Sequence, residues 1–238
     1  MSSNYTELFK RYLEHSNEKE KGNEVLSSFL QKNISNRTLD YGCGTGAFLK
    51  SILPYSKEII AMDEENRLSS ELQNNSEIKF IKGNLFEINF TETFDTIIAA
   101  YVLWEIPFSK WNNFLNKCKK IISSNGKVII IDSAPLKNFD NPFFNFNHNL
   151  KASNDYPDWY EYLNKEELSY KSYPFTSEIK AKDEEEMYLI LEFFFQSKNY
   201  QKFYSENRQK IINDFKSKKT KDGVIITMHH AMDILSFN

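Results

Sequence analysis

The chain has 238 residues, of which 40% are hydrophobic, 26% charged and 15% aromatic, and its formal net charge is −3. This length is typical of one domain, and the hydrophobic and aromatic content excludes an intrinsically disordered chain. The slightly negative charge gives no positive field that would draw in nucleic acid, so a nucleic-acid partner is disfavoured.

Cysteines and apolar runs exclude further classes of protein. The only cysteines, Cys43 and Cys118, form no CxxC pair and lie far from any histidine at metal-ligand spacing. The sequence therefore predicts no disulfide framework and no metal site. It also lacks a secretory pattern over residues 1–11 and any run of about 18 apolar residues, so we expect a cytoplasmic protein with no membrane segment.

The first 133 residues alternate between helical and strand patterns. Residues 5–30 predict one or two helices. Short β-branched or aromatic runs then predict strands at 38–41, 58–62, 78–81, 94–101 and 127–131. Between them, apolar residues at helical spacing predict helices at 47–53, 65–72 and 110–122. The alternation predicts an α/β fold with an open parallel sheet and helices on both faces.

The second half of the chain has a different pattern. Residues 139–175 are rich in Asn, Asp, Pro and aromatics, helices return at 183–195 and 200–215, and residues 223–237 predict one long strand or two. We expect a single domain over 1–238, with a helical segment (1–33), a ligand-binding core (34–133), a substrate cap with helices (134–222) and a closing strand segment (223–238).

The most specific signal is the sequence LDYGCGTG at residues 39–46, between the first predicted strand and the next helix. Glycines at such a turn permit positive φ and a close approach of the backbone to a ligand. The helix that follows offers free N–H donors. The loop predicts a nucleotide-like ligand at the carboxyl ends of the strands.

Two classes of ligand fit this loop by spacing. Gly42, Gly44 and Ala47 satisfy the dinucleotide pattern G-x-G-x-x-A, and Asp63 follows where a ribose-binding acid is expected, so a nicotinamide-dependent reductase stays open. Asp40, two residues before the first glycine, favours S-adenosylmethionine instead, because that ligand presents an ammonium group and a pyrophosphate does not. The chain also lacks a Tyr-x-x-x-Lys pair of the short-chain reductase type.

Four motifs in order resemble those of the class I S-adenosylmethionine-dependent methyltransferases. They are LDYGCGTG, IIAMDEEN around Asp63, FDTIIAAYVLWEIP after residue 93 and GKVIIIDS before residue 134. The resemblance covers residues 37–133. It implies a mostly parallel, seven-stranded Rossmann-like sheet, an N-terminal helical lid and a helical, aromatic cap after the fifth strand. It also implies methyl transfer from S-adenosyl-L-methionine, which leaves S-adenosyl-L-homocysteine.

The resemblance implies a cofactor site built from the ends of four strands. Its members are Asp40, Gly42, Cys43, Gly44, Gly46, Asp63, Glu64, Asn84, Leu85, Ala100 and Tyr101. Asp40 would meet the methionine amino group, Asp63 would accept hydrogen bonds from both ribose hydroxyls, and Asn84 would meet the adenine amino group. Leu85 would line the adenine face.

The catalytic and substrate residues carry weaker signals, because the cofactor itself supplies the activation. Glu105 and His148 are the candidates for a general base. The expected substrate contacts are Tyr101, Trp104, Phe146, His148 and Trp159. Family members often have paired histidines where this chain has Trp104 and Glu105. The aromatic cap favours methylation of an O or N atom of a small molecule or short peptide.

Other functions stay open at this point. They are a tRNA or rRNA methyltransferase, a non-catalytic S-adenosylmethionine-binding protein on the same fold, and the nicotinamide-dependent reductase. The sequence predicts nothing about the oligomeric state.

Overall fold

The computed structural model describes residues 3–133, 159–195 and 198–237. Contacts divide this part of the chain into two compact units. The first contains residues 3–18, 176–195 and 198–229, and the second contains residues 19–133, 159–175 and 230–237. The units do not follow the predicted divisions after residues 33, 133 and 222, and the single-domain organisation stays a prediction.

The sheet is mostly parallel, as predicted, and its parallel strands lie in the second unit. Its five parallel strands are β1 (Ser35–Tyr41), β2 (Ser56–Asp63), β3 (Ile78–Lys82), β4 (Phe94–Ala100) and β5 (Ile122–Ser133). The long β8 (Gly223–Ser236) runs antiparallel to β5, and β6 (Ser169–Ala181) ends the order β3-β2-β1-β4-β5-β8-β6. A two-residue strand, β7 (Lys219–Thr220), pairs with β8 as an eighth strand of the described chain. The predicted α/β fold is therefore confirmed.

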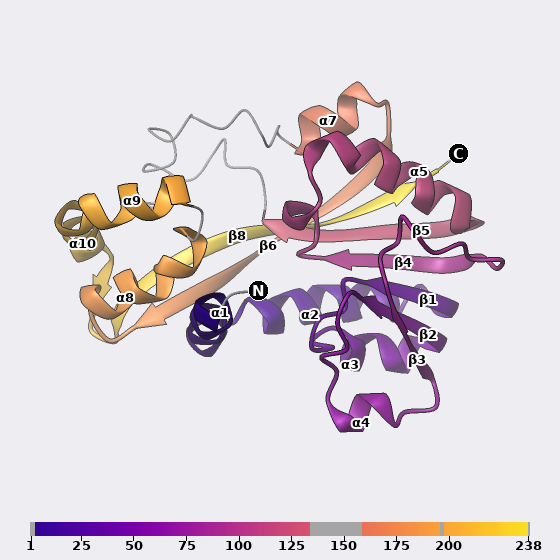
Figure 1. Ribbon diagram of the computed structural model, residues 1–238, viewed down its shortest axis with the longest axis horizontal. Helices are drawn as coiled ribbons and strands as arrows, with labels where there is room; N and C mark the ends of the chain where they lie inside the picture. Colours follow the sequence, from indigo (N-terminus) through magenta and orange to yellow (C-terminus); the bar gives the residue numbers. More distant parts are fainter. Residues whose placement is uncertain (1–2, 134–158, 196–197, 238) are drawn as a thin grey trace. The chain divides into compact units, whose positions relative to one another are not determined.

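Helices cover both faces of this sheet (Figure 1). They are α2 (Glu18–Leu30), α3 (Leu49–Ile52), α4 (Ser70–Gln73), α5 (Trp111–Ile121) and α7 (Trp159–Lys165), with single 3-10 turns at Leu53–Tyr55, Leu103–Glu105 and Phe108–Lys110. The helix predicted at 110–122 is confirmed as α5.

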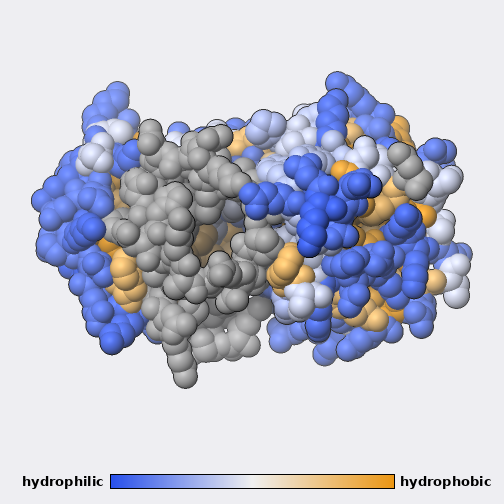
Figure 2. Space-filling model, turned by 90° about the horizontal axis from the view of Figure 1, so that it is seen from above, coloured by the Kyte–Doolittle hydropathy of each residue, from blue (hydrophilic) through white to orange (hydrophobic). Residues whose placement is uncertain are grey.

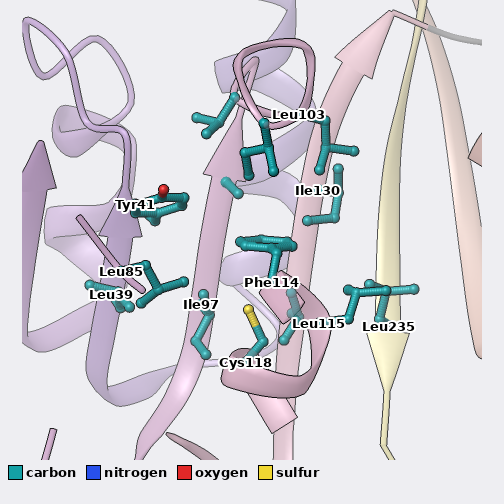
Figure 3. Packing of buried hydrophobic residues seen from close by; sticks show 14 of the residues in the cluster. Leu39, Tyr41, Leu85, Ile97, Leu103, Phe114, Leu115, Cys118, Ile130 and Leu235 are labelled. Atoms are coloured by element: carbon teal, nitrogen blue, oxygen red, sulfur yellow. The ribbon is translucent and has the colours of Figure 1, made fainter. Parts of the chain in front are cut away.

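The alternation of side chains along each strand builds two separate cores. Leu39, Ile97 and Ile130 point to one face, where they pack with Phe114 of α5 (Figure 3). Their neighbours in sequence, including Ile98, point to the other face and pack with residues of α2 and α3. Since both faces of the parallel strands are buried, the strands are apolar at consecutive positions, which is the signal that predicted them.

The first unit contains mainly helices and has a core of its own. It holds α1 (Ser3–His15), α8 (Glu184–Leu191), α9 (Lys198–Glu206) and α10 (Arg208–Phe215), with 3-10 turns at Glu192–Phe195 and Lys216–Lys218. Its aromatic rings stack closely: the Tyr188 and Tyr204 centroids are 4.3 Å apart, and Tyr12 of α1 stacks on Phe193 at 5.4 Å. None of the described helices in either unit has the length and apolar character needed to cross a bilayer.

The helix predicted at 65–72 is the main difference between sequence and structure within the core. Only Ser70–Gln73 is helical there. Asp63 and Asn66 each accept a hydrogen bond from the backbone N–H two residues further on, which holds the chain in turns, and Ser69 caps the short helix by accepting from the Leu72 N–H. Such side-chain bonds compete with helix formation.

Candidate functional site

The glycine turn after β1 combines close packing with open space. Gly42, Gly44 and Gly46 have φ angles of 71°, 55° and 83°. A Cβ on Gly42 would lie 2.4 Å from Val102 Cγ2, and one on Gly46 would lie 2.5 Å from Leu72 Cδ1. A Cβ on Gly44 would meet no atom within 4 Å. A side chain at either outer glycine would therefore displace a neighbouring side chain, whereas the middle glycine borders open space.

Asp40, in β1 directly before this turn, is a buried acid without a full set of partners. Its side chain is 2% exposed, and its Oδ2 has no hydrogen-bond partner among the described residues. Burial, together with the nearby charge of Asp63, raises the pKa of Asp40 to about 7. A buried oxygen of this kind requires an explanation, and the ammonium group of a bound ligand fits it. The sequence predicts this position for the amino group of S-adenosylmethionine.

Asp63 ends β2 beside the same turn and is bound on both of its oxygens. Oδ2 accepts a hydrogen bond from the Gly44 N–H at 2.8 Å, and Oδ1 accepts one from the Glu65 N–H at 3.3 Å. Arg67 Nη2 lies 3.3 Å from each oxygen. The sequence analysis did not identify Arg67, because a cation four residues after an acid outside a helix has no recognised pattern.

Asn84 follows β3 and joins the group through Glu64. Its Nδ2 donates to Glu64 Oε1 at 3.0 Å, while its Oδ1 accepts from the Phe86 N–H at 3.1 Å. The structure thus brings Asn84 and Glu64 together at one edge of the sheet. Leu85, the next residue, is fully buried in the core beneath α5, so its predicted contact with an adenine face has no exposed surface to support it.

Tyr101 directly follows Ala100, the last residue of β4. Its φ of 57° is strained for a non-glycine residue. Its N–H donates to the Ile131 carbonyl at 2.7 Å. Its ring stacks on Phe48 and lies 3.7 Å from Lys19 Nζ, and its hydroxyl is 3.5 Å from Nδ1 of the buried His230. The turn after β4 is therefore held in place from α2, β5 and β8.

Cys43 lies inside the glycine turn, and its surroundings disfavour the thiolate form. It is 7% exposed, and burial raises the pKa of its thiol well above the usual range. The thiolate is the reactive form of cysteine, so Cys43 acts as a small packing residue. Within the described residues no group of three or more potential ligands could hold a metal ion.

Glu105 lies in the 3-10 turn after β4, at the same edge of the sheet as the acids. Partial desolvation, with the charges of Asp63 and Glu64, raises the pKa of Glu105, and the charge of Arg67 opposes that rise. Of the other candidates, Phe146 and His148 lie outside the described residues, and of Trp104 only the backbone, in the same turn as Glu105, is described.

Trp159, predicted to touch substrate, lies in the core instead. It is 9% exposed, its Nε1 donates to Asp233 Oδ2 at 3.0 Å, and its ring packs against Trp111 and Tyr162. These contacts give Trp159 a structural role between α7 and β8. The position does not favour a contact with substrate.

Comparisons with known proteins identify relatives of this chain at the level of family and fold. A family model described as "Methyltransferase domain" matches residues 39–130. An uncharacterized methyltransferase of Alkaliphilus oremlandii is 22% identical over 130 residues, which are 54% of this chain and 57% of that protein. The chain spans about half the length of the curated relatives it matches.

Two solved structures share the fold over most of this chain. The YcgJ protein of Bacillus subtilis has a TM-score of 0.61 at 15% identity, covering 90% of this chain and 99% of its own. The N-methyltransferase NodS of Bradyrhizobium japonicum WM9, in complex with S-adenosyl-L-homocysteine, has a TM-score of 0.54 at 13% identity, covering 91% of this chain and 85% of its own.

Proposed function

Since residues 39–130 form a class I S-adenosylmethionine-dependent methyltransferase domain, we propose that this enzyme methylates an O or N atom of a small molecule or short peptide. The observation that carries the proposal is the buried Asp40 carboxyl, with its unpartnered oxygen, directly before a turn whose middle glycine borders open space. S-adenosylmethionine as cofactor excludes the nicotinamide-dependent reductase.

The residues at the sheet edge would divide the binding of the cofactor between them. Asp40 would pair with the ammonium group, Asp63 would accept from the ribose hydroxyls, and the Asn84 side chain would be available to the adenine amino group. When bound, S-adenosylmethionine supplies an activated methyl group on a sulfonium, and its product is S-adenosyl-L-homocysteine. The protein then has to align the acceptor and exclude water.

Glu105 is the described residue best suited to take a proton from the acceptor. Its carboxyl lies at the same edge of the sheet as Asp63, and its raised pKa brings it closer to neutral pH, where a general base works best. The same carboxyl would attract a cationic amine as it approaches. His148 stays a prediction for this role.

A small acceptor is supported by the surface and by one structural relative. The visible described surface is mostly hydrophilic (Figure 2), and the only large hydrophobic residues exposed on the described chain are the scattered Ile34, Phe108 and Leu189. With a net charge of −3, the chain has little to attract a nucleic acid. NodS, which shares the fold, is an N-methyltransferase.

The test uses purified protein and methyl-labelled S-adenosylmethionine with a panel of acceptors. Small amines, small hydroxyl compounds, short peptides and bulk tRNA and rRNA are compared at equal mass. We expect label in at least one small amine, hydroxyl compound or peptide, and none in RNA. Transfer to RNA alone would contradict the proposal, and binding of S-adenosylmethionine without transfer to any acceptor would favour a non-catalytic protein.

A further inference from the structure

Arg67 occupies the carboxylate that the cofactor is expected to use. It lies in the turn between β2 and α4, and its side chain is 37% exposed, against 11% for Asp63. A single nitrogen, Nη2, contacts both Asp63 oxygens at 3.3 Å. This is a long contact shared by one nitrogen, not the short two-nitrogen fork that makes arginine–carboxylate pairs strong. The pair is therefore weak enough to be displaced.

Counting acceptor positions shows what that displacement involves. An ionised carboxylate has about four lone-pair positions, two on each oxygen. The Gly44 N–H and Arg67 take both positions on Oδ2, and the Glu65 N–H and Arg67 take both on Oδ1. Arg67 thus holds one position on each oxygen, and these are the two that a ribose diol needs in order to donate two hydrogen bonds. The Asp63 carboxylate therefore has too few acceptor positions to keep both contacts with Arg67 and to accept two hydrogen bonds from a ribose diol at the same time.

We propose that Arg67 is a specificity residue of the cofactor site, which holds Asp63 in the free enzyme and must release it when the ribose of the cofactor binds. Its first effect is to lower the affinity for S-adenosylmethionine and S-adenosyl-L-homocysteine alike, because both carry the same ribose. This proposal rests on the predicted role of Asp63 as the ribose acceptor.

The charge of Arg67 adds a second effect that separates the two ligands. The sulfonium gives S-adenosylmethionine one more positive charge than S-adenosyl-L-homocysteine. The released guanidinium stays attached near the site, where its charge already acts on Cys43 and Glu105. It therefore opposes the cationic substrate more than the neutral product, and so favours product inhibition.

Isothermal titration of Arg67→Gln with each ligand, in low salt at pH 7.5, tests both effects without any methyl acceptor. We expect S-adenosyl-L-homocysteine to bind about two- to fivefold more tightly than it binds the wild type, the range that an exposed ion pair allows. S-adenosylmethionine should gain about a further twofold, and salt should reduce that extra gain. Unchanged or weaker binding of S-adenosyl-L-homocysteine to Arg67→Gln would overturn the proposal.

Lys50→Gln is the matched control. Lys50 forms an exposed ion pair with Glu71 at 3.4 Å, so this variant also loses one positive charge and one surface ion pair but leaves Asp63 as it is. Its affinity for both ligands should equal that of the wild type. An equal gain in Lys50→Gln and Arg67→Gln would reduce the effect to net charge and contradict the proposal.

Asp63→Asn separates the proposal from the role on which it rests. Alone, this variant should weaken the binding of S-adenosyl-L-homocysteine, and in its background Arg67→Gln should no longer tighten it. Undiminished binding by Asp63→Asn would show that Asp63 is not the ribose acceptor. Weakened binding by Asp63→Asn, together with an Arg67→Gln gain that persists in its background, would show that Arg67 acts elsewhere.

Discussion

Asp40 links the stability of the ligand-free protein to pH. Folding raises its pKa from 3.8 to about 7, so between these values the folded chain holds a proton that the unfolded chain has lost. The stability of the ligand-free protein therefore falls as the pH rises from about 4 to about 7, by at most about 4 kcal/mol, and stays reduced above that. Asp40→Asn removes this loss. Thermal melts should show the variant more stable than the wild type at pH 8 and similar to it at pH 4.

Binding at Asp40 should depend on pH with the opposite sign. The ligand's ammonium group prefers the ionised carboxylate, so the affinity for S-adenosyl-L-homocysteine should rise as the pH rises through about 7. Asp40→Asn should bind about ten- to a hundredfold more weakly and show no such rise, because an amide offers the ammonium no charge. A wild-type affinity that is flat from pH 5.5 to 8.5 would refute this role.

The glycines of the turn should respond differently to alanine. At Gly44 a Cβ meets open space, so Gly44→Ala should lose only about 1–2 kcal/mol from the positive φ, while the added methyl group enters the ligand's room and weakens binding. At Gly42 the Cβ overlaps Val102, and Gly42→Ala should lose about 2–5 kcal/mol. Urea unfolding measures the stability loss of both variants, and calorimetry measures their ligand binding. A larger loss of stability in Gly44→Ala than in Gly42→Ala would contradict this prediction.

Among the elements, α7 is fastened to β8 through a buried hydrogen bond. Trp159→Phe keeps the aromatic packing but removes the indole N–H that donates to Asp233, a residue that is 3% exposed. We expect a loss of about 1–3 kcal/mol in stability, because the buried Asp233 carboxyl loses one of its donors and keeps the Tyr160 hydroxyl. The Kd for S-adenosyl-L-homocysteine should not change. Wild-type stability combined with a raised KM for an identified acceptor would restore the predicted substrate role.

The strands were more predictable from sequence than the helices and turns between them. Consecutive apolar residues in β1, β2 and β4 can only be buried on both faces, so their positions followed directly. β6 was missed because it contains Pro174 and polar residues, although Tyr173, Phe175, Ser177 and Ile179 alternate at strand spacing. Proline is tolerated there because β6 is last in the sheet order.

At the scale of the whole molecule, the sequence makes sharper predictions for the cofactor side of the site than for the acceptor side. The predicted cofactor side combines glycines with positive φ and acids at strand ends, and such features leave a local pattern in the sequence. The pairing of Arg67 with Asp63 and the burial of Trp159 depend on contacts within an irregular segment or between distant segments. Such contacts leave no local pattern in the sequence. Aromatic residues that could bind an acceptor look the same in sequence as those that fill a core.

The motifs that resemble those of the methyltransferases lie in one of the two units. Residues 39–130, matched by the family model, lie within the second unit, whereas the first unit has its own aromatic core around Tyr188 and Tyr204. A change in the first unit, such as Tyr204→Leu, should therefore act on stability through that core.

A crystal structure of the protein with bound S-adenosyl-L-homocysteine would be the most direct test of the central claim. The account predicts the ligand against Gly44, with its amino group on Asp40, both ribose hydroxyls on Asp63, and Arg67 turned away from that carboxylate. A ligand bound elsewhere, or one at the glycine turn whose ribose leaves Asp63 to Arg67, would contradict it.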